Sequence, residues 1–88
     1  MSLAHPIDSF TALVLFKFRT MERVNRIKEV LVIQGKTQVW LAEQLGKSKN
    51  AVALMCNNKT QPHLLELKRI ANLLEVDIRE LLVSTLPK

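Results

Sequence analysis

From residue 21 onward, apolar side chains recur every three or four positions, a spacing typical of helices that bury one face. Glycine, asparagine and proline residues interrupt this spacing at intervals. The pattern predicts five helices, over residues 21–34, 38–45, 49–57, 63–74 and 78–83. Asp77 and Glu80 have the spacing of a capping box at the start of the last helix. The expected fold is therefore all-α, a compact domain over residues 21–88 with one small core. The apolar positions expected to face that core are Val24, Ile27, Val30, Leu31, Leu41, Ala42, Leu45, Val52, Met55, Leu64, Leu67, Ile70, Ala71, Leu74, Ile78, Leu81 and Leu82.

Residues 1–20 differ from the rest and are expected to form an apolar N-terminal extension, either a leader or a dimerisation arm. The extension holds all three phenylalanines. Alternating positions from Phe10 to Phe18 suit a strand, and an overlapping set suits a helical stripe, so its structure stays open. It is expected to pack on a partner subunit or, alternatively, on its own domain. The longest unbroken apolar run, 12–16, is far shorter than the ~20 residues of a membrane span. No membrane association is expected.

Residues 37–57 carry the most informative pattern, two short helices joined by a tight turn. Thr37 and Ser48 are candidate N-caps for the helices that follow them. Gly46 lies just past the first helix, where a left-handed residue can end it sharply. Ala42, four residues before that glycine, is small enough to let the two helices approach closely, and Val52 closes the second helix onto the first. This arrangement is a helix-turn-helix.

The stretch from residue 25 to residue 82 resembles the phage-repressor (Cro/Xre) helix-turn-helix family over about two thirds of the chain. That resemblance implies a compact five-helix domain that binds duplex DNA, usually as a dimer. One departure is Asn58, which stands where the family often has glycine; asparagine tolerates the left-handed conformation better than most residues, so the loop should survive. The residues that carry the resemblance are Gln38, Leu41, Ala42, Leu45, Gly46, Ser48, Val52, Asn57, Lys59, Pro62, Leu64, Leu67, Ile70, Ala71, Leu74, Val76 and Arg79 to Leu82.

Four apolar residues lie where the family is usually polar or outside the expected core. They predict a second buried surface, which is either a dimer interface or a seat for the N-terminal extension. These residues are Val39, Trp40, Leu65 and Leu73.

Composition and charge agree with a nucleic-acid partner. The 88 residues carry a formal net charge of +5, and the pI is near 9.8. A basic surface of this kind favours an anionic partner such as DNA. Cys56 is the single cysteine, which excludes an intrachain disulfide and a cysteine-based zinc site and suggests a reducing, cytoplasmic location. His5 and His63 belong to no ligand or catalytic motif, so no catalytic residue, metal or cofactor is expected.

Candidate DNA-reading residues lie on the second helix of the motif. Lys49 can donate to guanine O6 and N7, and Asn50 can pair with adenine N6 and N7. Ala53 is small enough to allow close approach to the groove. Leu54 is expected either to contact a thymine methyl group or to pack against a neighbouring loop.

A second set of polar residues is expected to contact phosphates or to support the base-reading side chains. Gln38 begins the first helix of the motif, where free backbone N–H groups favour phosphate. For each lysine in the set the alternative is an ordinary solvated charge. The other members flank the two helices and are Lys36, Lys47, Asn57, Lys59 and Thr60.

The function expected from these features is that of a sequence-specific transcription regulator that binds duplex DNA as a homodimer. The alternative is an antitoxin or another module that uses the same domain to bind a protein partner. An enzyme is not expected, because no nucleophile–base pair or metal-binding constellation is present in the sequence.

Overall fold

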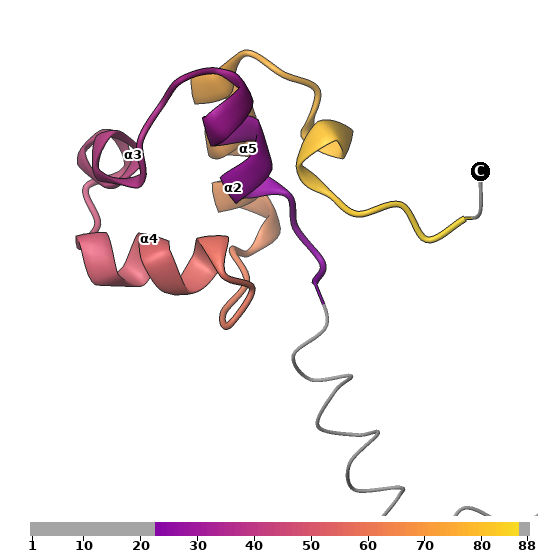
Figure 1. The fold of residues 1–88 in the computed structure, drawn as a ribbon, viewed down its shortest axis with the longest axis horizontal. Coiled ribbons are helices and arrows are strands. Elements are labelled where there is room, and N and C mark those ends of the chain that lie inside the picture. Colours follow the sequence, from indigo (N-terminus) through magenta and orange to yellow (C-terminus); the bar gives the residue numbers. More distant parts are fainter. Residues whose placement is uncertain (1–22, 87–88) are drawn as a thin grey trace, which may run out of the picture.

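The computed structural model describes residues 23–86, and the domain in this range is built from short helices (Figure 1). The expected extension, residues 1–20, lies outside the described residues. Helices α3 and α4 cross rather than run parallel, and α2 and α5 lie beside them. The elements in chain order are α2 (Ile27–Ile33), α3 (Gln38–Leu45), α4 (Lys49–Cys56), α5 (Leu64–Leu74) and the 3₁₀ helix η1 (Ile78–Leu81).

The turn between α3 and α4 has the geometry that its sequence predicts. The Thr37 hydroxyl accepts a hydrogen bond from the Trp40 N–H at 2.9 Å and so caps α3. The Ser48 hydroxyl caps α4 in the same way, through the Ala51 N–H at 3.0 Å. Gly46 has a φ of 68°, in the left-handed region, and ends α3. Three local signals therefore fix the helix-turn-helix.

The core lies where the faces of all five elements meet. Every residue in it apart from Cys56 was expected there from helical spacing. Cys56, whose burial the helical spacing did not predict, is 3% exposed. The buried apolar residues are Ile27, Val30, Leu31, Leu41, Ala42, Leu45, Val52, Met55, Cys56, Leu67, Ile70, Ala71, Leu74 and Leu81.

The prediction of five α-helices is not confirmed, because the part of the chain that the structure describes contains four. The segment expected to form the fifth is the 3₁₀ helix η1, and the chain is already extended at Leu82. Leu82 forms an antiparallel bridge with Asn25, in which the Arg26 N–H donates to Leu81 O at 2.7 Å and the Val83 N–H donates to Val24 O at 2.9 Å. This pairing removes residues 82–83 from any helix.

The same pairing shortens the first predicted helix, which was expected to begin at Met21. Helix α2 begins at Ile27, and residues 23–26 are not helical. The backbone N–H groups of Val24 and Asn25 donate to the side chain of Asn58, and Val24 O belongs to the bridge. Val24 therefore lies half-exposed instead of in the core.

Two further core assignments are wrong, and one is correct only in part. Leu64, the first residue of α5, is 78% exposed. Leu82 is also exposed, on the bridge. Ile78 only packs against the edge of the core.

The four apolar residues expected to form a second surface divide into two pairs. Trp40 and Leu73 pack against the edge of the core, whereas Val39 and Leu65 are exposed.

Candidate nucleic-acid interface

Helix α4 presents one row of exposed and half-exposed residues to solvent. Lys49, Ala53 and Asn57 follow one another at intervals of four, so they lie on one face of the helix. Lys49, Asn50 and Asn57 are exposed, whereas Ala53 and Leu54 are partly covered. The opposite face carries Val52, Met55 and Cys56 into the core. The four predicted base-reading residues are therefore accessible from outside, with the polar pair at the N-terminal end of the helix.

The residues expected to contact phosphates lie at the start of α3, in the turn between α3 and α4, and in the loop after α4. Gln38 is the first residue of α3 and is partly covered, and Lys36 precedes it in the linker. The Lys36 ammonium lies 4.7 Å from the centre of the Trp40 ring, a cation–π contact that holds this side chain at the start of α3. Asn57, Lys59 and Thr60 are all exposed in the loop after α4.

Lys47 forms an ion pair within the domain that its sequence position did not predict. Its ammonium lies 3.1 Å from Oε2 of Glu66, whose side chain is only 8% exposed, while that of Lys47 is 38% exposed. Glu66 lies in the first turn of α5, so this ion pair ties the turn of the motif to that helix. The Lys47 ammonium therefore already has a carboxylate partner within the domain.

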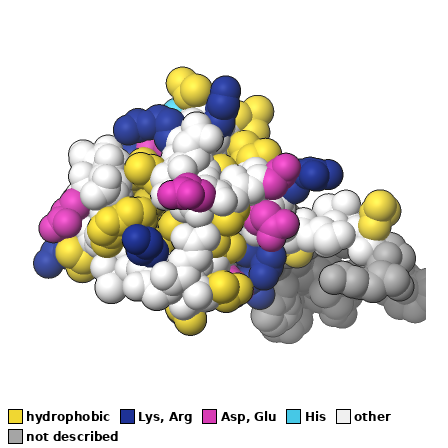
Figure 2. All heavy atoms as spheres, turned by 90° about the horizontal axis from the view of Figure 1, so that it is seen from above, with side chains coloured by type: hydrophobic (Ala, Val, Ile, Leu, Met, Phe, Trp, Pro, Cys, Tyr) yellow, Lys and Arg dark blue, Asp and Glu magenta, His cyan; other side chains and the backbone are white. Residues whose placement is uncertain are grey.

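Charge is distributed unevenly between the α4 side and the opposite side of the domain. Residues 44–65, which include the turn, α4 and the following loop, contain three lysines and no aspartate or glutamate. Figure 2 views the molecule from the side away from α4 and shows several carboxylates there among basic and hydrophobic side chains. A polyanion would therefore meet no carboxylate belonging to this segment.

The loop after α4 is held by a network of three amide side chains, two of which are buried. Asn58 has a φ of 60°, the left-handed conformation expected for this position. Its Oδ1 accepts hydrogen bonds from the backbone N–H groups of Val24 and Asn25 and from Gln61 Nε2, and its Nδ2 donates to Asn25 O. Asn25 Nδ2 donates to Met55 O and to Gln61 Oε1. Sequence reasoning identified the backbone requirement at Asn58 but missed the network.

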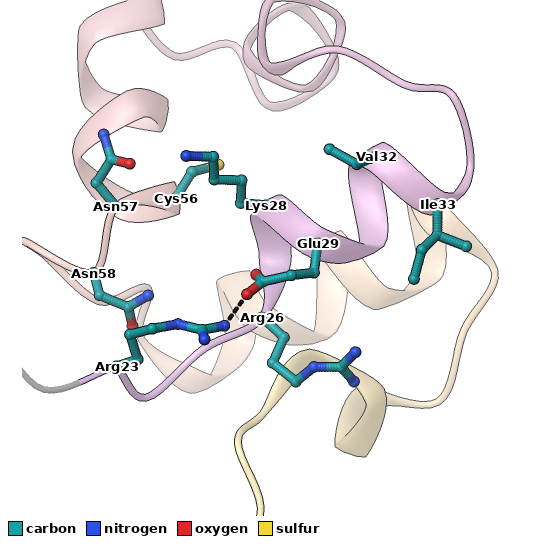
Figure 3. Close-up of a pocket in the computed structure, with 9 residues that line it drawn as sticks. All are labelled: Arg23, Arg26, Lys28, Glu29, Val32, Ile33, Cys56, Asn57 and Asn58. Atoms are coloured by element: carbon teal, nitrogen blue, oxygen red, sulfur yellow. Dashed lines mark hydrogen bonds and ion pairs between the residues drawn. The ribbon is translucent and has the colours of Figure 1, made fainter.

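A groove of about 580 Å³ lies between α2 and the C-terminal end of α4 (Figure 3). Its lining combines basic side chains with the apolar ends of Val32 and Ile33, and Arg23 forms an ion pair with Glu29 across it. Cys56 also lines the groove, and burial raises the pKa of its thiol to about 11, against a smaller opposing effect of Lys28. A thiol with this pKa stays protonated at neutral pH, so it is not an activated nucleophile.

Neither a metal site nor a membrane-crossing helix is found in residues 23–86. No three histidine, cysteine, aspartate or glutamate residues there are grouped so that they could hold a metal ion. None of the helices in this range is both long enough and apolar enough to cross a bilayer.

Comparison with known proteins agrees with this geometry. A helix-turn-helix family model matches residues 27–81. A crystal structure of a protein from Bacteroides fragilis, described as a "putative DNA-binding protein", matches with a TM-score of 0.67 and 50% sequence identity, over 68% of this chain and 97% of that chain. No curated protein sequence matches the chain. The family match covers more than half of the sequence, and it includes both helices of the motif and the core of the domain. The chain therefore belongs to the Cro/C1-type helix-turn-helix family, whose members are DNA-binding regulators.

Proposed function

We propose that this protein is a sequence-specific transcription regulator that places α4 in the major groove of duplex DNA as a homodimer, in the cytoplasm. The observation that carries the proposal is the exposed polar end of α4, which its Ser48 cap and the turn after α3 hold against the core. In a helix-turn-helix protein the N-terminal residues of the second helix contact base edges, while the first helix crosses the backbone.

Under this proposal each exposed residue has a chemical role. Lys49 donates to guanine and Asn50 pairs with adenine through one donor and one acceptor. Ala53 and Leu54 offer small or apolar contacts deeper in the groove. The free N–H groups at the start of α3, beside Gln38, are suited to a phosphate.

Phosphate contacts are assigned to the side chains that flank α4. Lys59, Thr60 and Asn57 in the loop after α4 are exposed and have no acidic neighbour in the sequence between residues 44 and 65. Lys36 is placed beside the start of α3 by its contact with Trp40. These contacts supply affinity and register but no sequence information.

The proposal is tested by selecting bound duplexes from a random pool and then comparing Asn50→Ala with the wild type. Losing a good bidentate contact costs ~1–3 kcal/mol, so affinity for the selected site should fall by about tenfold to a hundredfold. Affinity for random duplex should stay nearly constant because the phosphate contacts remain. Alanine is a good helix former, so the fold should persist.

The matched control is Asn72→Ala, the same substitution at an exposed position of α5. It should change neither affinity. Equal losses of specific and random binding in Asn50→Ala would remove the base-reading role of Asn50. A selection that enriches no sequence would overturn sequence-specific binding as a whole.

A homodimer is proposed because one short recognition helix supplies little affinity and the domain keeps large apolar side chains in solvent. Val32, Ile33, Leu64 and Leu65 are all more than two thirds exposed. Sedimentation at micromolar concentration should give about twice the chain mass of 10.1 kDa. A monomer both free and on DNA would contradict this part of the proposal.

The alternative of an antitoxin or other partner-binding module is not favoured, since neither the family description nor that of the Bacteroides fragilis structure names a protein partner. We also propose a binding protein and not an enzyme, as is typical of this family.

A further inference from the structure

Three amide side chains connect the loop after α4 to the start of α2 across more than thirty residues of sequence. Asn25 and Asn58 are only 1% and 6% exposed, which is unusual for a pair of uncharged polar residues in so small a domain. Gln61 closes the network at its exposed edge.

The hydrogen-bonding capacity of the two asparagines is well used. Asn58 Oδ1 lies 2.7 Å from the Val24 nitrogen and 2.9 Å from the Asn25 nitrogen. Asn25 Oδ1 accepts from the Ile27 N–H at 3.1 Å and thus holds the first turn of α2. Asn25 Nδ2 reaches Met55 O at 3.1 Å, in the last turn of α4. The network therefore joins the N-terminal end of one helix to the C-terminal end of another.

The turn itself does not require the Asn58 side chain. A glycine can adopt its φ of 60° without steric cost, so the amide group must be explained by its contacts. Figure 3 shows Asn58 beyond the end of α4, close to the chain segment that carries Arg23. The side chain of Asn58 anchors the loop from one side.

The following residues are anchored to α4 from the other side. The N–H groups of Lys59 and Thr60 donate to Leu54 O, at 2.9 Å and 3.3 Å. Two of the proposed phosphate-contacting residues, Lys59 and Thr60, lie between the buried Asn58 and Gln61 in the sequence. Their backbone is held between two members of the network.

We propose that Asn25, Asn58 and Gln61 are positioning residues for DNA binding, which hold the Lys59–Thr60 backbone in its phosphate-binding geometry before DNA arrives. The inference rests on the proposed function. A loop that is ordered in advance does not lose conformational freedom on binding, so more of the contact energy appears as affinity. Without the network, the loop would have to be ordered by the DNA itself.

The test is a double-mutant cycle between Asn58→Gly and Lys59→Ala, measured by fluorescence anisotropy on the selected duplex over a range of salt concentrations. Asn58→Gly keeps the left-handed backbone and removes only the amide. We expect it to weaken binding by about tenfold, equivalent to ~1.4 kcal/mol. Lys59→Ala should reduce the slope of log affinity against log salt by roughly one in the wild type. In the Asn58→Gly background it should change the slope much less.

Two further variants separate positioning from loss of stability. Ile70→Val truncates the core of α5 and lowers stability without touching the loop, and it should leave DNA affinity and the Lys59→Ala effect unchanged while the protein is folded. Gln61→Ala disturbs only the exposed edge of the network and should weaken binding less than Asn58→Gly, in the same direction. Amide hydrogen exchange at Lys59 and Thr60 should be faster in Asn58→Gly and unchanged in Ile70→Val.

The outcomes distinguish the inference from the function on which it rests. A wild type that binds no duplex removes the proposed function. A wild type that binds, with Lys59→Ala equally costly in both backgrounds, overturns the inference alone. A Lys59→Ala variant that costs nothing in the wild type overturns both the inference and the phosphate role proposed for Lys59. Unchanged exchange of the two loop amides in Asn58→Gly would also overturn it.

Discussion

Replacing Lys47 with alanine should destabilise the domain, because it leaves the buried carboxylate of Glu66 without its cation. The ammonium and the carboxylate are 3.1 Å apart, and the Glu66 side chain is 8% exposed. Breaking a fully buried pair costs about 3–5 kcal/mol, and an exposed pair is worth roughly 0.2–1 kcal/mol. Lys47 is 38% exposed, so this pair lies between the two limits. The position of Glu66 in the first turn of α5 also favours its negative charge. We expect a loss of about 1–3 kcal/mol in the free energy of unfolding.

The measurement is urea denaturation followed by the fluorescence of Trp40, the single tryptophan. Four proteins form the cycle: the wild type, Lys47→Ala, Glu66→Gln and the double variant. In the Glu66→Gln background no buried charge is left unpaired, so Lys47→Ala should cost less than about 0.5 kcal/mol. Lys49→Ala, two residues away and fully on the surface, is the control and should change stability by no more than about 0.5 kcal/mol. An equal cost of Lys47→Ala in both backgrounds would refute the reasoning, because it would show that Glu66 does not depend on this lysine.

Two other predictions concern the thiol and the left-handed residues. The pKa of Cys56 rises from 9.0 to about 11 on folding. Alkylation of this thiol at pH 8 should therefore be about a hundredfold slower in the folded than in the urea-unfolded protein. The folded state should also lose stability as the pH rises from about 9 to about 11, because the thiol releases its proton at a lower pH in the unfolded chain. Gly46→Ala should lower the free energy of unfolding by about 1 kcal/mol, because alanine is strained at the φ of 68°. Glu75→Gly should raise it by about 0.5–1 kcal/mol, because glycine adopts the φ of 57° without strain. Both changes can be measured from the midpoints of urea denaturation.

The helix-turn-helix could be predicted from the sequence because each of its determinants acts on close neighbours. Thr37 and Ser48 cap the residues three positions ahead, and Gly46 ends a helix through its own backbone angles. Such signals are complete within a few residues, and the structure confirms all three. Most of the core followed equally well from helical spacing, because a buried stripe is also a local pattern.

The failures share a physical cause, which is pairing between residues far apart in the sequence. The ion pair of Lys47 was missed because Glu66, nineteen residues later, gives no local sign that it turns inward. The first helix was extended back to Met21 because Val24 continues its apolar stripe. In the structure, the side chain of Asn58 accepts a hydrogen bond from the backbone N–H of Val24, and residues 23–26 are not helical. The predicted fifth α-helix does not form for the same reason, since residues 81–83 in its second half pair with residues 24–26.

The position of these distant contacts links closure of the domain to the surface proposed to bind DNA. Residues 24–26 pair with residues 81–83 on one side and with Asn58 on the other, so the two ends of the described domain and the loop after α4 meet along one short segment. That loop contains Lys59 and Thr60 but few apolar anchors of its own. Part of its order is therefore supplied by the ends of the fold through Asn58, in addition to the local hydrogen bonds to Leu54 O in α4. A change that opens the Asn25–Leu82 bridge should thus reach the phosphate-contacting loop through Asn58, while the capped turn between α3 and α4, which is held by local bonds, keeps its geometry.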